Sequence, residues 1–261
     1  MPGPVSGWPA RLPVPEERAR GKEPGQGDRA AARTGPTVPV PVPRFDYVAP
    51  AGAAHPYPFV GYPFIPGERL NDCAEDVQRA EWWRPPLGAF LTAFHRFPTE
   101  RAFALDVGGY PTAAAWRSAM ADLCRRGLVT VEGLVTVRQR EAIRAYFDAF
   151  LADDTAFAFE PTLVHQDLGD HNLLVDPARR RLTGVLDFAN CTVGDPALDV
   201  GKQNLPYYGG CVDAGWPARV EFYRRTAPFV DIEFFRRAGS GPANEERIAR
   251  RLEKINQLWP D

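Results

Sequence analysis

Polar side chains that could do chemistry interrupt the apolar runs of one short window, LVHQDLGDHNLLVDPARRRLTGVLDFAN, from Leu163 to Asn190. The window is typical of a loop, a strand, a turn and a second strand, with its polar residues gathered where the strands open onto solvent. Carboxylates and imidazoles exchange protons with substrates, and carboxylate and amide oxygens bind hard cations such as Mg²⁺. The candidate residues are His165, Asp167, Asp170, His171, Asn172 and Asp187.

The composition is that of a packed globular protein whose partner is a small molecule. The 261 residues carry 31 Lys and Arg against 33 Asp and Glu, so the bulk charge favours neither nucleic acid nor an anionic membrane as partner. The four cysteines lack CxxC spacing, which disfavours a zinc knuckle or a dense disulfide framework. No apolar run has the length of a signal peptide or a membrane span. We therefore expect a cytoplasmic protein with free thiols.

The elements before the window are predicted from periodicity and composition. Residues 1–35 are rich in Pro, Gly and charge, which predicts a disordered segment. The alternation of Val and Pro that follows predicts an extended edge segment, and residues 59–62 predict a short buried strand. From about Asp72 the pattern becomes helical. One helix is expected in PPLGAFLTAFHRFP, and another in AAAWRSAMADLCRRG with Gly127 as its stop.

The same periodicity continues on both sides of the window. Further helices are predicted in TVRQREAIRAYFDAFLADD, PARVEFYRRTAPFVDIEFFRR and ANEERIARRLEKINQLW, and strands in HNLLVD and RLTGVLDF. His95 shares the apolar face of its helix, and we interpret it as a satisfied core residue. That face carries Leu87, Phe90, Leu91, Phe94 and His95.

The window resembles the aminoglycoside phosphotransferase family of small-molecule kinases, which are related in fold to the protein kinases. His165, Asp167 and Asn172 spell H-x-D-x-x-x-x-N, and fifteen residues later an apolar run ends in Asp187 of LDFAN, followed by GDPALD. The fragments VPVPRFDYV, PFIPGE and FLTAFH resemble the same family in the same order, so the resemblance covers residues 36–240. It implies transfer of a phosphoryl group from Mg-ATP, or Mg-GTP, to a hydroxyl of a small molecule such as an amino sugar or a macrolide.

Phosphoryl transfer requires positioning and neutralisation of charge on the phosphate oxygens rather than covalent help from the protein. By the resemblance, Asp167 orients the acceptor hydroxyl and takes its proton. Asn172 and Asp187 are expected to supply oxygen ligands to Mg²⁺ alongside phosphates and water.

Neighbouring polar residues are expected to support the site rather than to react. His165 is expected to hold the loop by packing and hydrogen bonding. Asp195 and Asp199 of GDPALD are expected to accept backbone N–H groups without touching substrate. Asp170 and His171 are expected to shape or solvate the loop.

The hinge between the family's two lobes, which accepts the adenine ring, corresponds to Tyr62-Pro63-Phe64-Ile65. Pro63 can offer its carbonyl, Ile65 both its carbonyl and its N–H, and Phe64 an apolar wall. A plain buried strand end is the competing interpretation of these residues.

Acidic residues of the C-terminal helices allow two interpretations, a surface for a cationic acceptor or a solvated face. The residues are Asp213, Glu221, Asp231 and Glu233.

The chain departs from the family upstream of PTVPVPVPRF. A complete member has a glycine-containing phosphate loop, a strand lysine that binds phosphates and a helical glutamate that pairs with this lysine. Lys22 is the sole lysine in that region, and no V-A-x-K strand surrounds it in RGKEPGQG. We therefore expect a family member without most of its small lobe and with weak or no activity in isolation; a misassigned start or a frameshift is one explanation.

The sequence thus predicts an α+β, protein-kinase-like fold. Residues 1–35 are expected to be disordered, 36–67 to be a remnant of the small-lobe sheet with the hinge, and 68–261 to be a mostly helical C-terminal lobe that carries the site. The alternative to an active phosphotransferase is a catalytically silent kinase-like binding module. A metallohydrolase that uses His165, Asp167 and His171 is a third possibility, disfavoured because no distant ligand completes its site.

Overall fold

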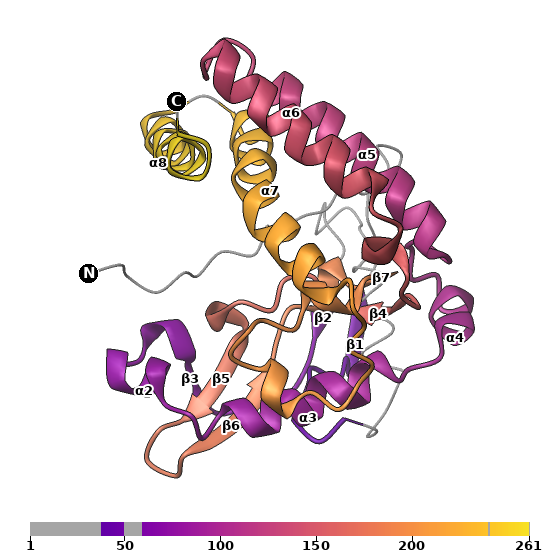
Figure 1. Cartoon of the computed structure of the whole chain (residues 1–261). Coiled ribbons are helices and arrows are strands. Elements are labelled where there is room, and N and C mark those ends of the chain that lie inside the picture. Colours follow the sequence, from indigo (N-terminus) through magenta and orange to yellow (C-terminus); the bar gives the residue numbers. More distant parts are fainter. Residues whose placement is uncertain (1–37, 50–58, 240, 261) are drawn as a thin grey trace. The chain divides into compact units, whose positions relative to one another are not determined.

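The computed structural model describes residues 38–49, 59–239 and 241–260. Its contacts divide the chain into two compact units, whose elements are labelled in Figure 1. The first unit comprises the described residues of 38–111 and 161–211, and the second those of 112–160 and 212–260. The segment predicted to be disordered, 1–35, lies outside the described residues. The lobe boundary predicted near residue 67 stays a prediction.

Three small antiparallel sheets form the strand part of the first unit. β1 pairs with β2, β4 pairs with β7, and the third sheet has the strand order β3-β5-β6. The hairpin of β5 and β6 corresponds to the two strands predicted within the opening window, so that prediction is confirmed. The strands are β1 (Tyr47–Ala49), β2 (Phe59–Gly61), β3 (Glu68–Arg69), β4 (Thr162–Val164), β5 (Leu173–Asp176), β6 (Arg181–Val185) and β7 (Thr192–Gly194).

The helices of the first unit centre on α3, whose apolar face is buried as predicted. All five residues of that face are no more than 6% exposed, and Phe90 stacks on Phe94 with ring centroids 5.5 Å apart. The α-helices are α2 (Glu75–Arg79), α3 (Arg84–His95) and α4 (Thr99–Ala104). The 3₁₀ turns are η2 (Leu70–Asp72), η4 (Asp170–Asn172), η5 (Phe188–Asn190), η6 (Pro196–Leu198) and η7 (Leu205–Tyr207).

The segment before the hinge differs from its prediction in one respect. Pro41 accepts a hydrogen bond from Val185 N–H at 3.0 Å, so the Val-Pro segment runs along the edge of β6 as expected. The strand at residues 59–62 is not buried, however, because Phe59 is 48% and Tyr62 is 42% exposed. Among the described residues β2 pairs only with β1, and the ring of Tyr62 packs against that of Phe45 with centroids 5.9 Å apart.

The second unit is built from four helices and one 3₁₀ turn. α5 begins at Thr112, whose hydroxyl accepts from Ala115 N–H at 3.1 Å, and α6 begins with a capping box between Thr136 and Gln139. Phe150 stacks on Phe222 with centroids 3.7 Å apart at the centre of the core. The elements are α5 (Ala113–Thr130), α6 (Val137–Ala152), η3 (Asp154–Phe157), α7 (Trp216–Arg237) and α8 (Pro242–Leu258).

Gly127 does not end its helix, contrary to the prediction. α5 continues to Thr130, and a Cβ atom at Gly127 would lie 3.5 Å from ring carbons of Phe229 and 3.6 Å from Phe147. These are ordinary van der Waals distances, so Gly127 lies inside the helix beside two aromatic rings and does not act as a stop signal.

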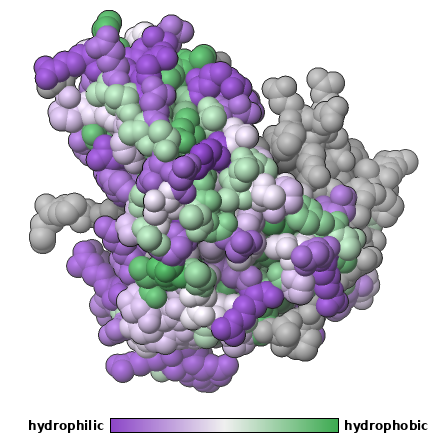
Figure 2. All heavy atoms as spheres, turned by 45° about the vertical axis from the view of Figure 1, so that its right-hand side comes forward, coloured by the Kyte–Doolittle hydropathy of each residue, from purple (hydrophilic) through white to green (hydrophobic). Residues whose placement is uncertain are grey.

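The surface of the protein mixes charged and apolar residues. Figure 2 shows polar side chains over much of the visible face, with smaller apolar patches between them. No helix in the described part of the chain combines the length and the apolar character that crossing a membrane requires.

A buried guanidinium organises the start of α7. Arg219 is 0% exposed and forms two hydrogen bonds with the carboxylate of Asp213, at 2.9 and 2.6 Å. It also donates to Ala156 O at 3.3 Å and lies over the ring of Phe159. Burial alone raises the pKa of Asp213, but the hydrogen bond and charge of Arg219 outweigh it, so the pKa is lowered. The carboxylate of Asp213 thus compensates the charge of Arg219, which water cannot reach.

Removing the carboxylate from this pair tests its contribution to stability. We expect Asp213→Ala to lower the free energy of unfolding by about 3–5 kcal/mol, because it leaves a buried charge uncompensated. Glu246→Ala is the matched control, since it breaks an exposed pair with Arg250 and is expected to cost less than about 1 kcal/mol. Urea denaturation of both variants measures the difference, and equal small losses would contradict the assignment.

Candidate active site

The pairing of β4 with β7 brings two polar segments of the sequence together. The 165–172 loop follows β4 directly, and the GDPALD segment overlaps the end of β7 and continues beyond it. Gln166 in the loop has a φ of 66°, a left-handed conformation that is costly for a residue with a side chain. The loop therefore needs an external support that holds this backbone conformation.

Asp199 provides that support. Its carboxylate, buried in the first unit, accepts the N–H of His165 at 2.6 Å and that of Gln166 at 2.9 Å. The ring of His95 donates to the same carboxylate from Nε2 at 3.0 Å, and its Nδ1 accepts from the hydroxyl of Tyr208 at 2.8 Å. Although burial raises the pKa of Asp199, the hydrogen bonds and charges of the two histidines lower it overall.

His95 is thus a satisfied core residue, as predicted, but it also has a connection that the sequence did not show. It lies 104 positions from Asp199, and only the tertiary structure brings the two together. Asp195 is buried as well, and its carboxylate accepts the N–H of Ala197 at 2.9 Å at the start of η6. Both GDPALD carboxylates accept backbone N–H groups; their part in catalysis stays a prediction.

His165 is fully buried and ties the loop to the end of β6. Its Nε2 donates to the carbonyl of Leu186 at 2.9 Å, and its Nδ1 accepts the N–H of Asp167 at 3.3 Å. The ring also packs on Phe188, with centroids 4.8 Å apart. Burial lowers the pKa of His165, which favours the neutral ring that these two hydrogen bonds require.

The β5–β6 hairpin carries the two residues predicted to bind magnesium. Asn172 precedes β5 and accepts the N–H of Leu186 at 2.8 Å, which places it across from the residue before Asp187. Asp187 has a φ of 61°, which turns the chain sharply after β6, and its side chain is exposed. The amide of Asn172 donates to Asp167 O at 2.8 Å. The three residues predicted to react therefore gather at the open end of one hairpin.

The chemistry of these two side chains fits a magnesium ion. Asn172 uses its amide nitrogen to bind the loop, which leaves its oxygen available, and the exposed carboxylate of Asp187 accepts from Ala189 N–H at 3.4 Å. Magnesium is commonly bound by one or two protein carboxylates together with phosphates and water. Among the described residues, no group of three or more His, Cys, Asp or Glu side chains is arranged to hold a metal ion.

Two nitrogen atoms of neighbouring side chains lie next to the carboxylate of Asp167. His171 Nε2 lies 3.5 Å from Oδ1, and Asn190 Nδ2 lies 3.4 Å from Oδ2. Sequence reasoning named the first of these neighbours as a residue that shapes the loop and missed the second. Asp170, which starts η4, is half-buried, and burial raises its pKa against the charges of His171 and Arg84.

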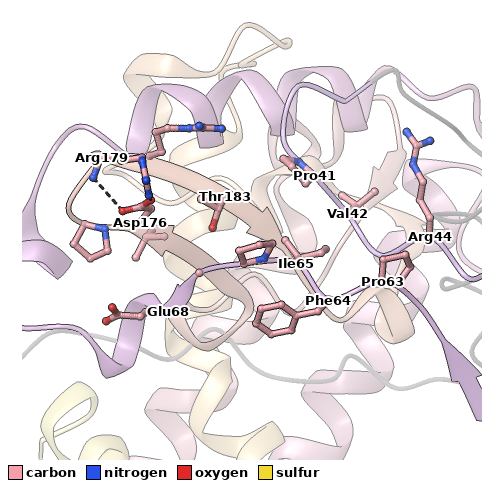
Figure 3. Close-up of a pocket in the computed structure, with 15 residues that line it drawn as sticks. Pro41, Val42, Arg44, Pro63, Phe64, Ile65, Glu68, Asp176, Arg179 and Thr183 are labelled. Atoms are coloured by element: carbon pink, nitrogen blue, oxygen red, sulfur yellow. Dashed lines mark hydrogen bonds and ion pairs between the residues drawn. The ribbon is translucent and has the colours of Figure 1, made fainter.

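The predicted hinge lines a cavity of about 750 Å³ along the turn half of the hairpin (Figure 3). Ile65 and Thr183 both line the cavity, and the ion pair of Arg179 with Asp176 lies at its turn end. Phe64 is 83% exposed, so the plain buried strand end is wrong for this residue. The lining residues include Pro41, Val42, Arg44, Pro63, Phe64, Ile65, Glu68 and Thr183.

Each of the four acidic residues considered for a cationic acceptor is paired with arginine. Glu221 accepts from both Arg224 and Arg225 at 2.6 Å, and the first of these hydrogen bonds is the main cause that lowers its pKa to about 2. The remaining pairs are Asp213 with Arg219, Asp231 with Arg251, and Glu233 with Arg126 and Arg237.

The profile of the phosphotransferase enzyme family (APH) matches residues 26–251. The chain belongs to this family. The match and the arrangement of the 165–172 loop agree with the resemblance inferred from the sequence. A comparison with curated proteins finds no significant match.

Solved structures of APH-family phosphotransferases share the kinase-like α+β fold of this chain. The GDP complex of aminoglycoside 2'-phosphotransferase-IIIa is 19% identical, with a TM-score of 0.67 over 89% of this chain and 82% of that chain. Macrolide 2'-phosphotransferase MphH from Brachybacterium faecium is 24% identical, with a TM-score of 0.66 over 93% and 83%. A streptomycin–ATP complex of APH(2")-IIa is 17% identical, with a TM-score of 0.58 over 88% and 77%.

Because His165 is buried and neutral, we expect the free energy of unfolding to depend on pH. Its pKa in the folded chain lies below the usual 6.5, so the unfolded chain takes up a proton first as the pH falls. We expect the free energy of unfolding to be greatest above the unfolded-state pKa of about 6.5 and to decrease as the pH falls below it, between about pH 7 and pH 5. His165→Gln should remove part of this decrease. Urea titrations across this pH range measure the effect, and an unchanged slope in His165→Gln contradicts it.

Proposed function

We propose that this APH-family chain transfers a phosphoryl group from a nucleoside triphosphate to a hydroxyl of a small molecule. The observation that carries the proposal is the gathering of Asp167, Asn172 and Asp187 at the open end of the β5–β6 hairpin. In this proposal, residues 36–67 represent a remnant of the small-lobe sheet with the hinge, and residues 68–261 the larger lobe.

Asp167 acts as the residue that meets the acceptor. Its carboxylate accepts a hydrogen bond from the hydroxyl, orients it toward the γ-phosphate and takes its proton. As the new O–P bond forms, the bond between the γ-phosphorus and the bridging oxygen breaks and the nucleoside diphosphate leaves. Asn172 and Asp187 hold the magnesium ion, which neutralises charge on the phosphate oxygens when bound. His165, Asp195 and Asp199 keep the loop and the segments around it in place without touching the substrates.

The nucleotide base occupies the cavity beside the hinge. Pro63 offers a carbonyl and Ile65 an N–H to the edge of the base, and Phe64 supplies an apolar wall. Thr183 precedes Asp187 by four residues, a separation of at most about 13 Å for an extended chain. Phosphates attached to a base in this cavity can therefore extend along the hairpin and reach the proposed metal ligands near Asp187. ATP and GTP are both candidates, and the complexes above contain GDP or ATP.

The acceptor class follows from the relatives, and an aminoglycoside or a macrolide is the proposed acceptor. The arginine partners of the four C-terminal acidic residues favour the less highly charged of the two classes, since a paired carboxylate attracts a polycation weakly. An ATP-consumption assay across aminoglycosides, macrolides and small amino alcohols tests this proposal.

A catalytically silent binding module is the second candidate, and one observation favours it. Lys202, an exposed residue, is the only lysine in the described part of the first unit, and Lys22 lies outside the described residues. The loss of a preorganised donor to transition-state charge costs about 10²- to 10³-fold in rate. Calorimetric titration with Mg-ATP separates the two candidates, since undetectable binding at millimolar nucleotide favours the silent module.

Substitution of Asp167 tests its assignment as the residue that takes the proton. We expect Asp167→Asn to lower kcat by about 10²- to 10⁴-fold, because the amide orients a hydroxyl but cannot accept its proton. Asp170→Asn is the matched control, since it changes a carboxylate on the same loop that has no assigned reaction step. Steady-state kinetics measure both variants. Turnover that survives Asp167→Asn shows that the assignment is wrong.

The metal dependence of nucleotide binding tests Asp187. We expect Mg²⁺ to strengthen ATP binding by the wild type, and Asp187→Asn to weaken the Mg-ATP complex by at least about tenfold without changing metal-free binding. Asp148→Asn serves as control, because its exposed carboxylate lies on α6 in the second unit and has no part in the proposed site. Calorimetric titrations with Mg²⁺ and with a chelator provide the comparison. An equal effect of Mg²⁺ in wild type and Asp187→Asn excludes a ligand role.

A further inference from the structure

The carboxylate of Asp167 is contacted by a residue outside its own loop. Asn190 Nδ2 lies 3.4 Å from Oδ2 of Asp167, across 23 positions of sequence. The distance is long for a hydrogen bond, but hydrogen bonds in a site without substrate are often loose and shorten in the reactive complex. Asn190 itself is only partly exposed.

Anchors on both sides fix the backbone of Asn190. It ends η5, whose first residue, Phe188, is buried against the rings of Phe94 and His165 at 5.7 and 4.8 Å. Cys191 donates to Phe188 O at 3.1 Å, and β7 begins at the next residue. The amide of Asn190 is therefore carried by a segment that core packing and a sheet both hold.

His171, the other residue that contacts the carboxylate of Asp167, has a more mobile setting because its side chain is largely exposed. The His171 side chain is 54% exposed, and its Nε2 lies 3.5 Å from Oδ1 within the same loop. The side chain of Asn190, in contrast, is only partly exposed and is carried by the segment between η5 and β7. Of the two neighbours, Asn190 is the one suited to hold the carboxylate in a constant orientation.

We propose that Asn190 is a positioning residue for the phosphoryl transfer proposed above. Its amide holds Oδ2, so that the carboxylate of Asp167 does not rotate away from the acceptor hydroxyl. Because Asn190 follows Asp187 by three residues in a rigid turn, the same contact fixes the proton acceptor relative to the metal ligand. The inference rests on the proposed function, but the contact itself can be tested without turnover.

Kinetics of two neighbouring variants test the positioning role. Asn190→Ala is expected to lower kcat by about tenfold or more, the worth of a hydrogen bond to a charged group, with KM for nucleotide and acceptor unchanged. Thr192→Val is the matched control, because it removes the hydrogen bond from Thr192 Oγ1 to Gly108 O, at 2.8 Å, from the same segment. This control is expected to lower the unfolding midpoint and to leave kcat unchanged.

Two further variants separate positioning from a general structural role. Asn190→Asp keeps the shape of the side chain but places a second carboxylate beside Asp167, so its loss of kcat should exceed that of Asn190→Ala. In the Asp167→Asn background, Asn190→Ala should cause little further loss, because the residue acts through Asp167. A kcat within twofold of wild type for Asn190→Ala overturns the proposal. So does a raised KM for Mg-ATP at constant kcat, which indicates a ligand.

Nuclear magnetic resonance of the full chain examines the contact independently of activity. The side-chain amide signal of Asn190, identified by its loss in Asn190→Ala, should shift in Asp167→Ala and stay in place in Thr192→Val. An unmoved signal in Asp167→Ala overturns the proposal. A wild type without turnover, combined with a shifted signal, counts against the proposed function and not against the contact.

Discussion

The buried carboxylate of Asp199 holds the 165–172 loop in a conformation that it would not adopt alone. Its two oxygens accept the N–H groups of His165 and Gln166, and Gln166 has a positive φ. A carboxylate without water is costly unless donors surround it, and here two backbone amides and the ring of His95 do so. The position of Asp167, one residue further along the chain, depends on this arrangement.

A second set of contacts connects the loop to the β5–β6 hairpin. His165 donates to Leu186 O, and Asn172 both accepts from Leu186 and donates to Asp167. These contacts leave the side-chain oxygen of Asn172 and the carboxylate of Asp187 at the open end of the hairpin. In the proposed function these two groups bind the magnesium ion that neutralises charge on the phosphates. The hinge and its cavity lie along the other half of the same hairpin. The proposed base site and the proposed metal site thus lie along the same small sheet.

The ion pairs of the second unit show how its arginines contribute to stability. Arg219 is buried with Asp213, while Glu221, Asp231 and Glu233 each bind arginines at shallower positions. Arg219 needs its partner because an isolated guanidinium in the core is costly, whereas the arginine side chains of the other pairs are 28–65% exposed and keep more contact with water. From the sequence alone the acidic residues could equally have faced an acceptor or solvent. Their partners lie three to 107 positions away, and the more distant ones are set by helix packing.

The sequence by itself determined the local features of this protein. Apolar spacing identified α3 and its buried face, and apolar runs joined by a Pro-containing turn identified β5 and β6. The resemblance of H-x-D-x-x-x-x-N and the later LDFAN to a known family selected Asp167, Asn172 and Asp187. Such patterns are readable because helices and hairpins are stabilised by residues close in sequence. Only the tertiary structure decided the pairing of β4 with β7, the contact of His95 with Asp199 and the approach of Asn190 to Asp167. Each joins segments separated by more than twenty residues, where packing and not local preference selects the partner.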